Sequence, residues 1–142
     1  MHVLLINGSP HEKGCTYTAL SLVAGELNAA GITTEILNVG TKPVGGCIGC
    51  GGCAKGNGCV FGGVVNEAIE KARTADAFVF GTPVHYASAS GNMTSFLDRL
   101  AYAGGKYLAY KPAAICASAR RAGTTSALDQ LVKYPEFFHM PL

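Results

Sequence analysis

Apolar residues occur along the chain in two alternating patterns, short continuous runs and longer stretches with helical spacing. The run over residues 3–7 predicts a strand that is buried on both faces. Residues 15–30 predict a helix that ends at Gly31, since glycine is frequent just after a helix. Residues 32–39 alternate and are rich in β-branched side chains, which indicates a second strand. The inward positions of the first helix are Leu20, Val23, Ala24 and Leu27.

The same alternation continues in the second half of the chain. Helical spacing predicts helices over residues 63–75, 91–103 and 124–134, and apolar runs predict strands at 77–80 and 113–117. Strands that are apolar throughout and alternate with helices specify a parallel sheet with helices on both faces. We therefore expect an α/β fold of three layers. In the helix over 91–103, the side chains expected in the core are Met93, Phe96, Leu97 and Leu100.

Parallel sheets bind ligands at the carboxyl ends of their strands. Those ends fall at residues 7–14, 40–62, 81–90 and 118–123, and most of the Gly, Ser and Cys residues gather there. The longest of these segments, 40–62, holds nine Gly and four Cys and has no periodicity. Packing alone does not order such a loop, so a ligand is expected on it.

Composition narrows the class of protein. At about 100 to 200 residues per domain, 142 residues allow one domain. The formal charge is only +2 and the cations are scattered, so no basic stripe is available for nucleic acid. No apolar run approaches the roughly 18 residues of a membrane span, and no leader peptide is recognisable at the start. We therefore expect a cytoplasmic protein that binds neither nucleic acid nor membranes.

Residues 8–18 join the first strand to the first helix. A helix N-terminus offers free N–H groups and a positive dipole end to an anion, and Ser9, Thr16 and Thr18 add hydroxyl groups. This arrangement suits a terminal phosphate. The spacing matches neither G-x-G-x-x-G nor G-x-x-x-x-G-K-[ST]. The alternative is a polar turn in which Thr16 is an ordinary N-cap.

Gly8-Ser9-Pro10 and the following residues resemble the loop G-S-P-R-x-x-[GS]-[NS]-T of the flavodoxin-like NAD(P)H-dependent FMN reductases. The resemblance spans nearly the whole chain and implies one flavodoxin-like FMN-binding domain over residues 1–142. His11 stands where the family often has Arg, and Cys15 where Asn or Ser is usual. The residues that the resemblance places around the FMN phosphate are Ser9, His11, Gly14, Cys15 and Thr16.

Two further loops carry the resemblance. Residues 81–91 are similar to the family segment G-[ST]-P-V-Y-x-x-x-x-[ST]-G, with His85 as a departure, and residues 118–125 are similar to [ST]-G-x-R-x-G-G at the pyrimidine edge of the flavin. The alternatives are a plain helix start at Ser90 with Tyr86 on the surface, and a solvated arginine pair. The implied contacts to the flavin ring come from Pro83, Val84, His85, Tyr86, Ala87, Ser118, Arg120, Arg121 and Gly123.

Four cysteines in the 40–62 loop have the spacing C-x2-C-x2-C-x5-C. Four thiolates separated by small glycines can surround one polynuclear centre, and a [4Fe–4S] cluster needs four such ligands. The motif resembles that of the iron–sulfur flavoproteins, a branch of the same superfamily, whose ligands match Cys47, Cys50, Cys53 and Cys59. Zinc and a loop with no assembled metal remain alternatives. Disulfides are disfavoured in a cytoplasmic protein.

The resemblance implies an FMN-dependent oxidoreductase that takes hydride from NAD(P)H at flavin N5 and passes electrons to a flavin, a quinone or the [4Fe–4S] cluster. The acceptor would be a small molecule or a redox protein, and a homodimer or homotetramer is expected. The alternatives are an electron-carrier flavoprotein without nicotinamide turnover and a zinc-stabilised binding domain. The chain also ends where family members begin a final strand and helix, so we expect these two elements to be missing.

Overall fold

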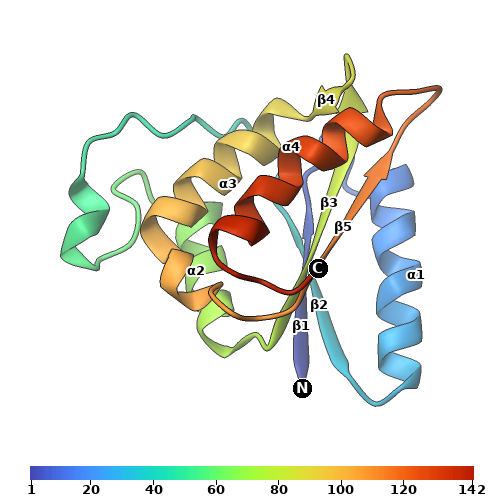
Figure 1. The fold of residues 1–142 in the computed structure, drawn as a ribbon, viewed down its shortest axis with the longest axis horizontal. Coiled ribbons are helices and arrows are strands. Elements are labelled where there is room, and N and C mark those ends of the chain that lie inside the picture. The colour runs from blue at the N-terminus through green and yellow to red at the C-terminus, as the bar shows by residue number, and fades with distance from the viewer.

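The computed structural model describes residues 1–142 and contains one mixed sheet of five strands (Figure 1). The long strands are parallel in the order β2-β1-β3-β5, and the short β4 runs antiparallel to the end of β3. The parallel sheet confirms what the alternation predicts, and its arrangement is the flavodoxin-like one that the resemblance implies. The strands are β1 (His2–Asn7), β2 (Thr33–Asn38), β3 (Ala77–His85), β4 (Ser88–Ala89) and β5 (Ala113–Ser118).

Helices cover both faces of the sheet, which confirms the three layers. Helix α1 lies on one face, and α2, α3 and α4 lie on the other (Figure 1). None of these helices combines the length and the hydropathy of a membrane-spanning segment. The α-helices are α1 (Cys15–Ala29), α2 (Val64–Thr74), α3 (Gly91–Gly104) and α4 (Thr124–Phe137), with 3-10 turns η1 (Gly52–Lys55) and η2 (Gly105–Tyr107).

The two faces of the sheet are unequally packed. The face under α2, α3 and α4 forms a cluster of 20 buried residues, which includes all four side chains expected inward on α3. The face under α1 forms a cluster of only five buried residues. Val23 of α1, which its spacing places inward, is 36% exposed, so the apolar stripe of this helix is narrower than expected.

Two elements extend further than their sequences predict. β3 continues through Pro83 to His85. Its pairing with β1 ends at Gly81, whereas its pairing with β5 continues to Pro83. Pro83 lacks an N–H group, and this costs no hydrogen bond to β1 because β1 no longer pairs there. α4 continues past Pro135, which is buried in the last turn and accepts hydrogen bonds from the N–H groups of Phe138 and Met140.

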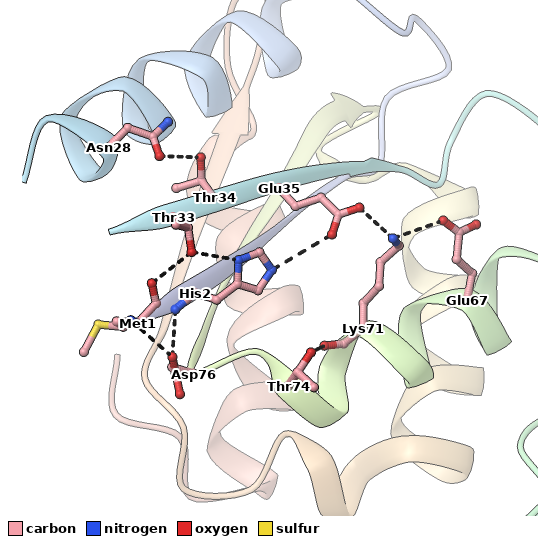
Figure 2. A network of polar contacts seen from close by, with 10 residues as sticks. All are labelled: Met1, His2, Asn28, Thr33, Thr34, Glu35, Glu67, Lys71, Thr74 and Asp76. Carbon is pink, nitrogen blue, oxygen red and sulfur yellow. Dashed lines mark hydrogen bonds and ion pairs between the residues drawn. The ribbon is translucent and has the colours of Figure 1, made fainter. Parts of the chain in front are cut away.

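A polar network lies at the amino end of the sheet, away from the ligand loops (Figure 2). His2 donates its backbone N–H to Asp76 at 2.7 Å, and its ring Nδ1 lies 3.2 Å from the hydroxyl oxygen of Thr33. Lys71 Nζ donates to Glu35 at 2.6 Å, which ties α2 to β2. The hydrogen bond to this carboxylate raises the pKa of Lys71.

Replacing Glu35 with glutamine is expected to lower the free energy of unfolding by about 0.5 kcal/mol at neutral pH, the scale of a partly exposed ion pair. A lysine with a raised folded-state pKa stabilises the fold below its ordinary pKa of 10.5 and loses that contribution above the raised value. Urea unfolding should therefore separate E35Q from wild type at neutral pH but not at strongly alkaline pH. Glu26→Gln, at an exposed carboxylate without an ion pair, is the matched control. A difference that persists above the raised pKa of Lys71 would contradict this account.

Candidate functional site

Three of the predicted ligand loops meet in one cleft of about 300 Å³ at the carboxyl end of the sheet. The loop after β1, the end of β3 and the loop after β5 each contribute to its wall. No carboxylate side chain lines this cleft, which leaves it open to an anion. The lining residues are Ser9, His11, Cys15, Thr16, Pro83, Val84, His85, Ser118, Ala119 and Arg120.

The loop after β1 is held by buried polar groups. The fully buried Asn7 accepts a hydrogen bond from the backbone N–H of Ser9 at 3.1 Å and donates to Asn38 at 2.7 Å. The Ser9 hydroxyl accepts the N–H of His11 at 3.1 Å, and Ser90 donates to the carbonyl of Gly8 at 2.7 Å. The loop conformation is thus set before any ligand binds, which lowers the entropic cost of binding.

The first turn of α1 has free backbone donors. Its N-cap is Gly14, with no side-chain capping bond, and the N–H groups of Cys15, Thr16 and Tyr17 have no acceptor in the protein. Together with the positive end of the helix dipole, these donors suit a phosphate group. These free N–H groups are the reason why the phosphate of FMN would fit this loop.

The hydroxyl groups of Thr16 and Thr18, which are expected to donate hydrogen bonds to an anion, lie in different surroundings. The Thr16 oxygen lies 2.7 Å from that of Ser118, so this residue joins α1 to β5. The interpretation of Thr16 as the N-cap is wrong, because Gly14 occupies that position. Thr18 is exposed, donates to the Gly14 carbonyl at 3.2 Å and does not line the cleft.

The tip of the β3–β4 hairpin is a two-residue turn in an unfavourable backbone conformation. Tyr86 and Ala87 have φ angles of 50° and 59°, in the left-handed region that glycine and asparagine normally occupy. The Tyr86 side chain is fully exposed. Gln130 of α4 holds β4 by accepting from Ser88 at 2.7 Å and from the N–H of Ala89 at 2.9 Å.

The double variant Tyr86→Asn, Ala87→Gly is expected to raise the free energy of unfolding by about 1–2 kcal/mol, because both residues suit a type I′ turn. FMN affinity should fall about tenfold, since the aromatic ring at the cleft edge is lost. Urea unfolding and FMN fluorescence quenching measure the two effects. Tyr110→Asn relieves a similar φ of 64° outside the cleft and should leave FMN affinity unchanged. Unaltered FMN affinity in the double variant would contradict a role for Tyr86.

The paired arginines occupy different surroundings. Both are exposed, but only Arg120 lines the cleft. Gly123 has a φ of 93°, and a Cβ there would lie 2.7 Å from the Cα of Ala87, so this glycine lets the two loops touch. Gly14, Tyr86, Ala87 and Gly123 do not line the cleft, although the first two adjoin lining residues in the sequence. A role of each predicted residue in holding FMN stays a prediction.

The 40–62 loop encloses a second cavity, of about 250 Å³, against α3. No three of its cysteines lie close enough together to hold one metal ion. Four thiols around one cavity are a donor set that fits a [4Fe–4S] cluster. The four cysteines that line this cysteine cavity are Cys47, Cys50, Cys53 and Cys59.

Several residues that shape these sites were not singled out by sequence patterns. Asn7 and Asn38 are the last residues of two neighbouring strands and pair in register. A polar residue at the end of each apolar strand is the sequence feature that could have identified them. Asn92 of α3 anchors the start of the cysteine loop through the N–H of Val44 and the carbonyls of Gly40 and Lys42. Only its tertiary contacts reveal its role.

The sequence profile of NADPH-dependent FMN reductases matches residues 1–142, the entire chain. The chain belongs to this family.

The chain is similar in sequence to two iron–sulfur flavoproteins. One, from Archaeoglobus fulgidus, is 33% identical over 99 residues, which are 70% of this chain and 48% of the relative. Another, from Methanocaldococcus jannaschii, is 30% identical over 99 residues, 70% of this chain and 51% of the relative. The chain thus spans about half the length of these relatives.

Solved structures share the fold. An apo NADH:FMN oxidoreductase superposes with a TM-score of 0.73 at 20% identity, covering 98% of this chain and 70% of the other. At this identity the likeness shows the flavodoxin-like fold.

Proposed function

We propose that the protein is an NAD(P)H-dependent FMN reductase of the iron–sulfur flavoprotein type, with FMN in the cleft and a [4Fe–4S] cluster in the cysteine cavity. The observation that carries the proposal is the pairing of two features in one chain. These are the free N–H groups at the start of α1 and four cysteines that surround one cavity.

The residues of the cleft would bind and orient the flavin. The N–H groups of Cys15, Thr16 and Tyr17 would hold the phosphate, helped by Ser9 and His11. Pro83, Val84 and His85 offer a surface for the flat ring, and Arg120 places a cation beside it. A cation there would stabilise negative charge on the reduced ring.

When bound, FMN would accept a hydride from NAD(P)H at N5 and release electrons singly or in pairs. The cluster in the cysteine cavity would carry single electrons toward the acceptor. The acceptor would be a small oxidant such as a quinone or a free flavin, or a redox protein. A cytoplasmic homodimer or homotetramer is part of the same proposal.

The cavity and the cleft are joined by α3. Its N-terminal Ser90 bonds the loop after β1, and Arg99, Tyr102 and Ala103 nearer its C-terminus line the cysteine cavity. Ser90 and Arg99 are nine residues apart, which is about 14 Å at 1.5 Å per residue. One rigid helix therefore contacts both the loop after β1 and the cysteine cavity.

Anaerobic purification followed by a visible spectrum and by iron, sulfide, zinc and FMN analysis tests the proposal. Flavin bands with iron and sulfide support it, and bleaching of the flavin by NADH or NADPH identifies the donor. Zinc without flavin would favour a zinc-stabilised binding domain and overturn the proposal. Flavin that no nicotinamide bleaches would indicate an electron carrier instead.

A further inference from the structure

Arg99 of α3 is a buried cation without an acidic partner. The residue is only 7% exposed, and no carboxylate lies within ion-pair distance of its guanidinium. Burying an unpaired charge is costly, so a buried arginine normally faces a carboxylate or another anion. The guanidinium instead faces the cysteine cavity, which it helps to line.

The hydrogen bonds of Arg99 all go to the cysteine loop. Nε donates to the sulfur of Cys59 at 3.2 Å. Nη1 donates to the carbonyl of Gly45 at 3.3 Å, and Nη2 donates to that of Gly62 at 3.0 Å. Gly45 precedes the four cysteines and Gly62 follows them, so a single side chain joins both ends of the loop. The ring of Phe61 covers the guanidinium, with its centroid 5.4 Å away.

Cys59 is the most firmly held of the four cysteines. The side-chain oxygen of Asn66 accepts its N–H at 2.8 Å, and the nitrogen of the same amide donates to its carbonyl at 3.0 Å. Its sulfur has Arg99 as a donor. Cys47 and Cys50, by contrast, are exposed in a segment without regular structure.

We propose that Arg99 is a positioning residue for the cluster, and that it raises the reduction potential of the cluster. The inference rests on the proposed [4Fe–4S] site and deepens it. A cluster bound by four thiolates carries net negative charge, which increases when it takes up one electron. A buried cation that also donates a hydrogen bond to a ligand sulfur stabilises the reduced form more than the oxidised form. The electron comes from the reduced flavin and leaves to the acceptor, so the cluster returns to its starting state.

Three variants test the inference. R99Q removes the charge but keeps a polar side chain, R99K keeps the charge but loses the planar fork, and K55Q removes an exposed charge from the same loop. FMN, iron and sulfide per chain report on folding and assembly. An EPR-monitored redox titration under anaerobic conditions reports the potential without requiring turnover.

In R99Q the ratio of reduced to oxidised cluster at a fixed potential should fall at least tenfold, which is a shift of about 59 mV for a one-electron couple. R99K should shift less, and K55Q should behave as wild type. Loss of iron from R99Q with FMN retained would support the positioning role. If R99Q retains neither cofactor, R99K tests the inference instead. A lowered potential or a lowered iron content in R99K would support it, and wild-type values of both would overturn it.

Two results would overturn the inference. A fully loaded R99Q with the wild-type potential would overturn it while leaving the cluster itself established. Equal shifts in R99Q and K55Q would show that only overall charge matters. If the wild-type protein binds FMN but contains no iron and sulfide, both the cluster and the role of Arg99 fail, while the flavin site stands.

Discussion

Replacing Gly40 with alanine is expected to weaken FMN binding at least about a hundredfold, which corresponds to about 2.7 kcal/mol. A Cβ at this position would lie 2.4 Å from the carbonyl oxygens of both Gly8 and Ser9. These are backbone atoms, so the loop after β1 must move and no rotamer change relieves the contact. Overpacking of this kind should also cost about 1–3 kcal/mol of stability. FMN fluorescence quenching and urea unfolding measure the two losses.

Gly25→Ala is the matched control for this substitution. Gly25 lies within α1, and nothing lies within 4 Å of a Cβ built there. Alanine should therefore stabilise the helix by about 0.5–1 kcal/mol and leave FMN affinity unchanged. Wild-type FMN affinity in G40A would show that the loop tolerates the displacement, and the proposed phosphate site would then need another position.

The second large effect is expected from Cys59→Ala, which should reduce iron and sulfide nearly to zero while FMN remains bound. Cys59 is the cysteine whose backbone and sulfur are both held by hydrogen bonds, so no neighbouring thiol can replace it without moving the loop. A [4Fe–4S] cluster needs four thiolate ligands, so the loss of the most firmly held one should prevent its assembly. Metal analysis and the anaerobic visible spectrum measure the result.

Cys116→Ala provides the control. This residue packs on the face of β5 toward α1, does not line the cysteine cavity, and burial raises the pKa of its thiol. Its removal should leave iron, sulfide and FMN at wild-type levels. Full iron content in C59A would exclude the C-x2-C-x2-C-x5-C motif as the ligand set.

The order of helices and strands could be predicted because each element carries its own periodicity. The runs around Leu4 and Ile115 and the inward positions of α3 needed no tertiary information. The extension of β3 through Pro83 could not be predicted, since it depends on where β1 stops pairing. Sequence rules end a strand at such a Gly-Thr-Pro segment, and only the register shows why this strand continues.

The candidate sites could be predicted only as far as motifs reach. The three loops and the four cysteines are local in sequence, so their spacing indicates their chemistry. Gly40, Asn92 and Arg99 act through contacts with residues 31 to 54 positions away, and no local pattern marks them. Arg99 in particular follows the buried Phe96 and Leu97 and resembles an ordinary polar position at the margin of a helix face.

The unequal packing of the two faces of the sheet has a consequence for how the molecule opens. Local unfolding begins where the fewest apolar contacts hold an element, and α1 is secured by the smaller of the two clusters. The first turn of α1 is also the segment that we propose binds the phosphate of FMN. Transient detachment of this helix would free the flavin while the larger cluster and the cysteine cavity stay intact. On the proposed function, the residence time of FMN would then depend on how easily α1 opens, and bound FMN would in turn stabilise the packing of α1 on the sheet.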